Sequence, residues 1–494
     1  MSSERGTTVG FRSERGAVLL ALMLATGLIA IDATILATAV PSVVAELGEF
    51  HQFPWLFSVY LLAQAVSVPI YAKLADTIGR KPVILVGVGL FLLGSILAGF
   101  AWSMTSLIWF RVLQGLGAGA VSPMAMTIVG DIYTVAERAM VQGYIASVWA
   151  ISSVVGPALG GLFSQFASWR WIFFVNIPLC LIAGWALIRS YHENVQRRRH
   201  RIDFAGAGLL TVGLTALILA LLEGGNAWAW ASWPSLISFG VGIIALALFP
   251  VVERRAAEPI LELSILARPL ILTTTLISLG VGALMIGVTS FVPTYLENAL
   301  GAVPLVSGIA VAALTLGWPL AASQAGRMYM RFGYRTTVLV GGLIALVGAV
   351  ALAVAGPWPS TITVAIISFV IGFGLGWTAA PSLIAAQASV GWDERGVVTG
   401  VNVFARSAGS AVGVAVFGAI ANQVIASGRG ERDFATIVSA STWVFAAVAV
   451  AAALMVLASI WLPRGGVDAP AYSVAAPDDP VEAPSVDEAE PASA

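Results

Sequence analysis

AVLLALMLATGLIAIDATILATAV, residues 17–40, contains one charged side chain, Asp32, in 24 residues. A helix needs about 20 apolar residues to cross the hydrocarbon core of a bilayer. The run is also too long for a cleaved signal peptide, whose apolar core has about 7 to 15 residues. Residues 17–40 are therefore predicted to form an uncleaved membrane span that holds a carboxylate.

The rest of the chain has the same character. Of its 494 residues, 59% are hydrophobic and only 10% are charged, against about 25% charged in a soluble domain. A water-soluble globule is excluded, and the sequence predicts an all-α polytopic membrane protein with 14 transmembrane helices. The predicted spans are 17–40, 55–75, 82–102, 105–130, 139–163, 171–190, 204–222, 233–252, 270–296, 304–325, 336–356, 360–386, 397–422 and 437–462.

The basic residues predict the orientation of these spans. The tails and the even-to-odd loops carry 20 Lys and Arg, whereas the opposite loops hold only Arg170, Arg429 and Arg432. Basic residues concentrate on the cytoplasmic side of membrane proteins. Both termini are thus expected in the cytoplasm, and the acidic tail 463–494, rich in Pro and Ala, is expected to be disordered.

Composition also excludes several classes of function. With 25 basic and 26 acidic residues the chain has no global basic face for nucleic acid. The single cysteine, Cys180, and three histidines without ligand spacing predict no metal site and no disulfide within the chain. No nucleotide-binding loop or catalytic cluster is found, so neither an enzyme nor a cofactor is expected. The Arg, Ala and Gly bias favours a bacterial source.

An internal repeat divides the chain. A shift of 257 residues superimposes Gly115-x-Gly117-x-Gly119 on Gly372-x-Gly374-x-Gly376, and a shift of 254 superimposes Lys73, Gly79 and Lys81 on Arg327, Gly333 and Arg335. Parallel repeats of six spans are a transporter architecture. The predicted organisation is a cytoplasmic tail (1–16), a six-helix bundle (17–190), linkers with inserted spans 7 and 8 (191–269), a second six-helix bundle (270–462) and the acidic tail.

Five motifs fall in order on these spans. They are Ile31-Asp32-Ala33-Thr34-Ile35 through Pro41, the loop Lys73 to Lys81, Arg111-Val112-Leu113-Gln114-Gly115, Gly156-Pro157-Ala158-Leu159-Gly160-Gly161, and Trp169-Arg170-Trp171 through Asn176-Ile177-Pro178. The set resembles the major facilitator superfamily, in particular its fourteen-span drug:proton antiporter branch of the multidrug and quaternary-ammonium efflux type. That resemblance implies a transporter that works by alternating access.

Asp32 and Arg111 are the leading candidates for proton coupling or cation binding. Each lies nine residues from the outer end of its span, at a depth of about 13 Å. Ionisable groups at such depth are functional candidates by default. Asp32 is hypothesised to bind either a proton or a cationic substrate, with Arg111 as tuning or replacement partner. The alternative is a structural pair joining spans 1 and 4.

Two further motifs have a functional and a structural interpretation. By the resemblance, Lys73, Asp76, Gly79, Arg80 and Lys81 form a conformational latch between the bundles, with partners near the start of span 11 and the 4–5 loop. Enforced topology and lipid contact are the alternative for the three cations.

The antiporter motif in span 5 comprises Gly156, Pro157, Gly160 and Gly161. It is expected to form a hinge or a close bundle contact; helix packing without gating is the alternative.

Aromatic, amide and thioether groups suit a cavity for lipophilic cations. The candidates are Tyr60, Gln64, Gln114, Met124, Trp149, Phe291, Tyr295, Trp377 and Arg406. Arg406 has no identifiable intramembrane acidic partner in the second half. Glu223 and Glu297, near outer span ends, are additional acidic candidates, with snorkelling to water as the alternative.

The sequence favours a proton-coupled antiporter that exports lipophilic, cationic drugs or dyes across the cytoplasmic membrane of a bacterium. An exporter of an endogenous lipid or siderophore is an alternative on the same fold, and a non-transporting sensor or scaffold is a third. The expected partners are the small substrate, protons and the bilayer, without nucleic acid. A monomer is expected because two halves can enclose a path.

Overall fold

The computed structural model describes residues 10, 13, 15–133, 135–193, 203–225, 227–256, 259, 263–356, 360–390, 395–428 and 433–463. Within these ranges the side chains of some helical residues, including Lys73 and Asp76, lie outside the described set. The acidic tail from residue 464 and the first nine residues lie outside it too. The predictions for those parts are therefore not tested.

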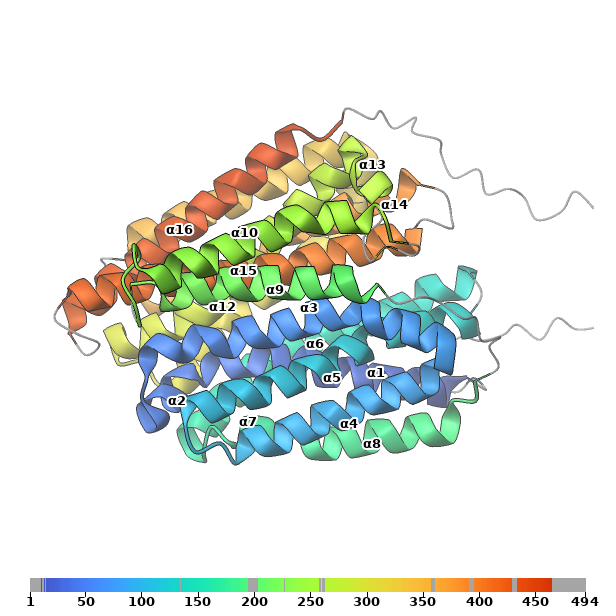
Figure 1. Ribbon diagram of the computed structural model, residues 1–494, viewed down its shortest axis with the longest axis horizontal. Coiled ribbons are helices and arrows are strands. Elements are labelled where there is room, and N and C mark those ends of the chain that lie inside the picture. Colours follow the sequence, from blue (N-terminus) through green and yellow to red (C-terminus); the bar gives the residue numbers. More distant parts are fainter. Residues whose placement is uncertain are drawn as a thin grey trace, which may run out of the picture.

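The described chain is helical (Figure 1). The first half consists of α1 (Gly16–Ile35), η1 (Leu36–Thr38), α2 (Val40–Leu47), η2 (Phe50–Gln52), α3 (Phe53–Ile78), α4 (Arg80–Gly99), α5 (Met104–Ile132), α6 (Val135–Phe166), α7 (Trp171–Phe174) and α8 (Asn176–Ser190). An inserted pair follows, α9 (Phe204–Glu223) and α10 (Trp233–Glu253). The second half consists of α11 (Leu263–Leu266), α12 (Pro269–Leu300), α13 (Pro304–Ala355), α14 (Thr361–Ala388), α15 (Arg395–Ser427) and α16 (Phe434–Ile460).

Twelve of the described helices are long and apolar enough to cross a membrane. The predicted number of fourteen is not confirmed by this count. One of the twelve, α13, has 52 residues and contains Gly333 with the non-helical angles φ 77° and ψ 160°. At 1.5 Å per residue α13 would be about 78 Å long if straight, more than twice the hydrocarbon thickness. The helix α3, with 26 residues, is not among the twelve.

The glycine repeat of the sequence corresponds to a repeated packing contact. A side chain on Gly117 would place its Cβ 2.6 Å from the carbonyl oxygen of Gly87, and one on Gly374 would lie 2.6 Å from that of Gly341. The first contact joins α4 to α5 and the second joins α13 to α14. In a bilayer the hydrophobic effect does not drive helices together. Small residues stabilise helix pairs there because they permit such close approach.

The turn after α3 has a counterpart in the middle of α13. Gly79 and Gly333 both have positive φ, 109° and 77°, a region that favours glycine because it has no Cβ. Two residues later, Lys81 Nζ donates to the carbonyl of Tyr191 at 2.5 Å, and Arg335 Nη2 donates to that of Ile460 at 2.8 Å. In each half a cation therefore binds the carbonyl end of that half's last helix, which favours positive charge.

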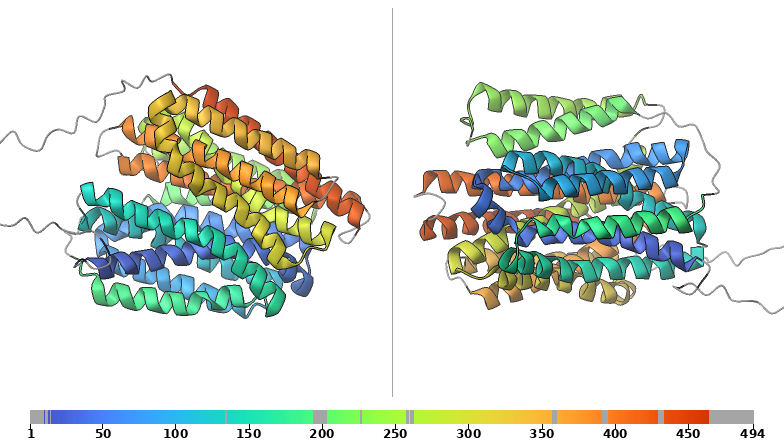
Figure 2. Two further views of the ribbon diagram at one scale, coloured as in Figure 1. Left: turned by 180° about the vertical axis from the view of Figure 1, so that it is seen from behind. Right: turned by 90° about the horizontal axis from the view of Figure 1, so that it is seen from below.

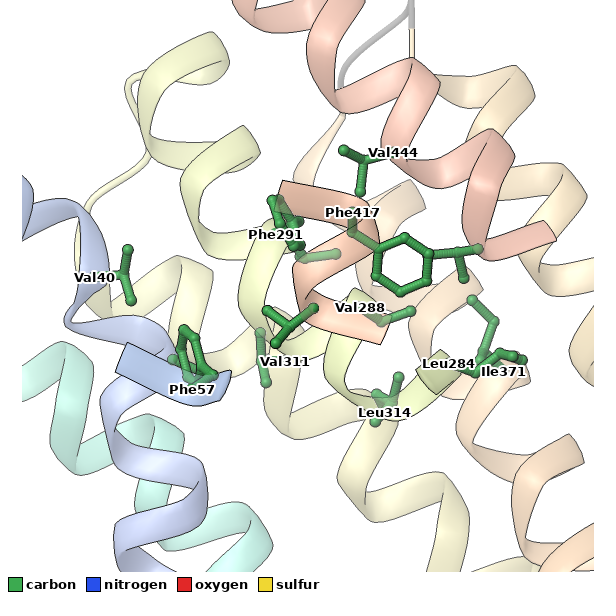
Figure 3. Packing of buried hydrophobic residues seen from close by; sticks show 14 of the residues in the cluster. Val40, Phe57, Leu284, Val288, Phe291, Val311, Leu314, Ile371, Phe417 and Val444 are labelled. Atoms are coloured by element: carbon green, nitrogen blue, oxygen red, sulfur yellow. The ribbon is translucent and has the colours of Figure 1, made fainter. Parts of the chain in front are cut away.

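The two halves share one apolar core at the predicted outer end. This core joins residues 35–43 and 53–57 of the first half to the apolar faces of α12, α13, α14, α15 and α16 (Figure 3). Phe53 and Phe291 meet across the halves with ring centroids 5.3 Å apart. Toward the predicted cytoplasmic end each half has a core of its own. The first half forms one cluster, whereas in the second half the large cluster continues to Tyr334 and Leu462, beside a small cluster of residues of α11, α12, α14 and α15 with Val390. The bundles accordingly diverge toward the end where α1 begins and α16 ends (Figure 2).

The inserted pair lies over the seam between the halves. Apolar side chains of α9 pack against Leu62 and Val66 of α3 and against Ala411 and Ala415 of α15. The helix α10 packs on α9 and leaves most of its apolar side chains exposed, as expected of a lipid-facing helix.

Two glycines of α4 offer a test of the packing. We expect Gly87→Val to lower the stability of the detergent-solubilised protein by about 1–3 kcal/mol, because overpacking forces helices apart. A Cβ at Gly87 would lie 2.6 Å from that of Ala120, whereas one at Gly89 would meet nothing within 4 Å. Thermal melts of Gly87→Val and the matched control Gly89→Val measure the effect. Equal melting temperatures would contradict the α4–α5 contact.

Candidate functional site

An ion pair lies buried within the first half. Arg111 of α5 donates through Nη1 to Oδ2 of Asp32 on α1 at 2.8 Å, and the two side chains are 2% and 1% exposed. The sequence predicts that the two charges lie at one depth, and the structure brings them into contact. Removing either partner of such a pair would leave an uncompensated buried charge, at a cost of about 3–5 kcal/mol.

Two amides complete the surroundings of the carboxylate. Gln114 Nε2 donates to Asp32 Oδ1 at 2.8 Å and Asn176 Nδ2 donates to the same oxygen at 3.3 Å. Both amides also approach Ser95 Oγ of α4, at 2.8 and 3.4 Å. Gln114, Ser95 and Asn176 are all fully buried. Four helices, α1, α4, α5 and α8, thus contribute to one hydrogen-bonded polar cluster, hereafter the Asp32 cluster.

Arg111 has partners besides Asp32. Its Nη1 donates to Gln114 Oε1 at 2.7 Å and its Nε donates to the carbonyl of Leu56 at 3.3 Å. The guanidinium carbon lies 4.0 Å from the centre of the Tyr60 ring, a cation–π geometry. The site can therefore hold the arginine charge whether or not Asp32 carries a charge of its own.

The antiporter motif forms close contacts on two sides of α6. Gly156 and Gly160 pack against α1 and η1, where Thr34 Oγ1 donates to the carbonyl of Ser152 at 3.2 Å and Thr38 Oγ1 to that of Pro157 at 3.1 Å.

Gly161 faces the second half. A Cβ at Gly161 would lie 2.5 Å from the carbonyl oxygen of Pro304, and Gly308 packs against the carbonyl of Pro157. The motif therefore joins the helix of Asp32 to the first turns of α13.

The described part of the predicted latch contacts its own half. The carboxylate of Glu193, just after α8, accepts hydrogen bonds from the backbone N–H groups of Arg80 at 2.6 Å and Lys81 at 3.1 Å. A Cβ at Gly79 would lie 2.6 Å from the same carboxylate. The predicted role of Lys73 and Asp76 stays a prediction, since their side chains lie outside the described residues.

The Trp169-Arg170 motif holds α2 at the predicted outer end. Trp169 Nε1 donates to Glu46 at 2.7 Å, and Arg170 forms an ion pair with the same carboxylate and donates to the carbonyl of Ala101. Burial raises the pKa of Glu46, but the hydrogen bonds from Arg170 and Trp169 outweigh it and hold the pKa below the ordinary 4.5. This motif organises the fold and lies apart from the Asp32 cluster.

Of the predicted cavity residues, Tyr60 and Gln114 lie against Arg111 at the Asp32 cluster, and the others lie elsewhere. Met124 is buried in the core of the first half, and Phe291 in the core that the halves share. Tyr295 is buried too, and its hydroxyl donates to the carbonyl of Gly356 at 2.7 Å. Trp149 is 39% exposed on α6. Residue type alone does not distinguish a side chain packed in a core from one that lines a cavity, because both kinds of side chain are apolar.

The other candidates lie in separate places. Gln64 is half-buried one turn after Tyr60, and the indole of Trp377 lies against Phe373 with ring centroids 5.1 Å apart. Arg406 is exposed on α15, and within the described part of the chain it makes no ion pair or hydrogen bond.

The two acidic candidates bind near the predicted outer end. Glu223 Oε1 accepts from Trp55 Nε1 at 2.9 Å, which ties α9 to α3. Glu297 accepts from Ser307 Oγ at 2.5 Å, which ties α12 to α13. Neither carboxylate belongs to the Asp32 cluster.

Ser95, Asn176 and Glu193 were missed as site residues. Asn176 stood within a quoted motif, and its position as a polar residue in an apolar span was the available signal. Ser95 had no comparable signal, because a lone serine in a span commonly bonds its own helix. Among the described residues no group of three or more His, Cys, Asp or Glu could hold a metal ion.

The comparisons with known proteins agree with this architecture. Residues 22–414 match the model of the Major Facilitator Superfamily. The chain is 33% identical over 413 residues to the multidrug transporter protein MdtP of Bacillus subtilis, covering 84% of this chain and 76% of that protein. It is 31% identical to multidrug resistance protein 3 of the same organism, covering 85% and 82%.

Solved structures share the fold at lower identity. A bacterial homologue of the human lysosomal transporter Spinster, in an inward-facing and unoccupied conformation, superimposes with a TM-score of 0.65 at 17% identity, over 91% of this chain and 98% of that one. A D-xylose–proton symporter gives 0.62 at 12% identity, over 92% and 99%. The helical membrane architecture and the matched family together show that this chain belongs to the Major Facilitator Superfamily and is a transporter, not an enzyme.

Proposed function

We propose that this transporter is a proton-coupled antiporter of the fourteen-span drug-efflux branch, which exports lipophilic cations by alternating access. The Asp32 cluster carries the proposal: a carboxylate held by a guanidinium and two amides, almost entirely buried within the membrane-spanning region. The names of the two Bacillus subtilis relatives support the class of cargo.

Competition for one carboxylate would couple the two fluxes. Asp32 takes either a proton or the charge of a cationic substrate, and Arg111 remains held by Gln114, Leu56 and Tyr60 when the carboxylate is neutralised. A proton entering across 100 mV contributes about 2.3 kcal/mol of electrical work. Moving one monovalent cation out against the same potential costs the same amount, about 2.3 kcal/mol, so a one-for-one exchange is electroneutral and is driven by the pH gradient, provided that the two occupants exclude each other.

The shared outer core and separate cytoplasmic cores support an inward-facing state of the cycle. Opening to the outside would then have to separate Gly161 from Pro304 and Gly308 from Pro157, since these contacts join the halves. The antiporter motif would act as the outer closure, because its glycines permit backbone contact that a side chain would block.

The proposed topology has fourteen spans with both termini in the cytoplasm of a bacterium. The additional crossings come from α3 and from division of α13 at Gly333, whose two parts of 29 and 22 residues are each long enough to cross. The first and last six spans form the two bundles, and α9 with α10 is the inserted pair. A single chain would suffice as the transporting unit.

Replacement of Asp32 tests the coupling. We expect Asp32→Asn to lose at least tenfold of the gradient-driven accumulation of ethidium in inside-out vesicles, because the amide cannot exchange a proton. Ethidium fluorescence, before and after the proton gradient is collapsed, measures accumulation. The matched control is Glu49→Gln, an exposed carboxylate before η2, which should accumulate like the wild type.

Two results would count against this proposal. Undiminished, gradient-dependent accumulation by a folded Asp32→Asn protein would remove Asp32 from the coupling. No accumulation by the folded wild type would instead favour an endogenous lipid or siderophore as the cargo.

Outer closure can be tested by cysteine labelling. Ser58 is fully buried, and its Oγ donates to the carbonyl of Ala411 across the α3–α15 seam at 3.2 Å. We expect a membrane-impermeant maleimide to label Ser58→Cys at least tenfold more slowly than the exposed Glu49→Cys in resting cells, and faster during transport. The parent protein provides the blank because Cys180 is buried. Equal labelling of the two positions at rest would refute the closed outer end.

A further inference from the structure

Only the NH2 group of the Asn176 side-chain amide forms hydrogen bonds among the described residues. Asn176 begins α8, is fully buried, and donates through Nδ2 to Asp32 Oδ1 at 3.3 Å and to Ser95 Oγ at 3.4 Å. Its own Oδ1 is buried and has no hydrogen-bond partner among the residues described. A buried acceptor without a donor costs about 1–3 kcal/mol, so the arrangement calls for an explanation.

The other amide of the cluster has no such freedom. Gln114 uses Nε2 for Asp32 Oδ1 and Ser95 Oγ, and its Oε1 accepts from Arg111 at 2.7 Å. Turning this amide over would point its NH2 group at the guanidinium, which has only donors. The orientation of Gln114 is therefore set by Arg111, whereas nothing comparable holds that of Asn176.

Protonation of Asp32 at Oδ1 turns this atom from a hydrogen-bond acceptor into a donor. As a carboxylate oxygen it accepts from both amides, as observed. Once a proton is added to Oδ1, the new O–H must donate, and Gln114 presents only N–H there. Turning Asn176 over by 180° about its Cβ–Cγ bond places its Oδ1 where Nδ2 lay and its NH2 group where the unpartnered Oδ1 lay, with little change in shape. That oxygen then accepts from Asp32 and can also accept from the hydroxyl of Ser95.

We propose that Asn176 is the positioning residue that adapts the Asp32 cluster to the protonation of Asp32, donating to the carboxylate and, turned over, accepting from the carboxylic acid. This inference rests on the proposed function of Asp32 as the proton carrier. This step adds one proton to Asp32 and exchanges hydrogen bonds. No other bond forms or breaks, and no electron is transferred. Asn176 thereby supports both states of the carboxyl group without movement of Arg111.

Among the described residues, the titratable or charged side chains that face Asp32 are Arg111 from α5, Tyr60 from α3 and Cys180 from α8. The helix α6 meets α1 through neutral groups such as Ser152. The Tyr60 hydroxyl is buried close to Asp32 and, within the described chain, forms no hydrogen bond of good geometry, so it is the rival acceptor for the Asp32 proton.

Infrared titration of the purified full-length protein tests the proposal without any substrate. The carbonyl band of protonated Asp32 is identified as the band that Asp32→Asn lacks, and its intensity against pH gives the midpoint of protonation. We expect Asn176→Leu to move this midpoint about one pH unit toward acid, a tenfold loss of proton affinity, because the carboxylic acid loses its acceptor. This loss outweighs that of the long 3.3 Å bond donated to the carboxylate, which alone would move the midpoint toward base. The band should also move to higher wavenumber.

The matched control is Asn402→Leu. Asn402 is a buried amide of α15 whose groups are both used, Nδ2 toward the carbonyl of Val398 and Oδ1 toward Ser278. Its loss should leave the Asp32 midpoint unchanged. Asn176→Thr, whose hydroxyl both donates and accepts, should recover part of the midpoint and serves as the second variant if Asn176→Leu folds poorly.

Three results would overturn the proposal. They are a midpoint that stays unchanged or moves toward base in both Asn176 variants, an equal shift in Asn402→Leu, or a shift in Tyr60→Phe alone. Failure of the proposed transport function would show differently. In that case the Asp32 midpoint would still respond to Asn176, while ethidium accumulation would be insensitive to Asp32→Asn.

Discussion

The burial of a carboxylate and a guanidinium in a medium that cannot hydrate them is the constraint on which the first half depends. An isolated charge of this kind is costly inside a membrane, and Asp32 and Arg111 are tolerated because each meets the other and additional hydrogen-bonding groups. The partners come from α3, α4, α5 and α8, so the helices of the first half are held around one polar centre. A scaffold built from apolar side chains would have no need of such a centre.

Elsewhere the helices are held by close contact between small residues. Lipid tails are as apolar as leucine, so burial of apolar area gives little preference for one helix pairing over another. Glycines supply that preference, because a carbonyl or a backbone N–H can approach where a side chain is missing. The same glycine contacts occur at α4–α5 and α13–α14. The polar cluster has no such repetition, since Ser368 occupies the position that corresponds to Arg111.

The inserted pair adds a constraint of its own. The helix α9 packs against both α3 and α15, and its outer end is tied to α3 by Glu223 and Trp55, while Trp230 donates to Gln423 of α15 at 3.1 Å. When the two halves move relative to each other, α9 must therefore either slide against both halves or move together with one of them. The contact with α3 is a hydrogen bond to a carboxylate, which is stronger than the neutral Trp230 contact.

The all-helical membrane class, the repeat and the common depth of Asp32 and Arg111 were predictable from the sequence, because they follow from residue-local quantities. The family followed from the resemblance of five motifs. Apolar length predicts a span, glycine spacing predicts a packed face, and counting residues from a helix end predicts depth. The contribution of Asn176 and Ser95, the placement of Met124 in a core and the division of the outer and cytoplasmic cores were decided only by the tertiary structure. Each depends on the rotation of a helix about its axis and on its neighbour, and in a chain that is apolar on all faces no periodic pattern records that rotation.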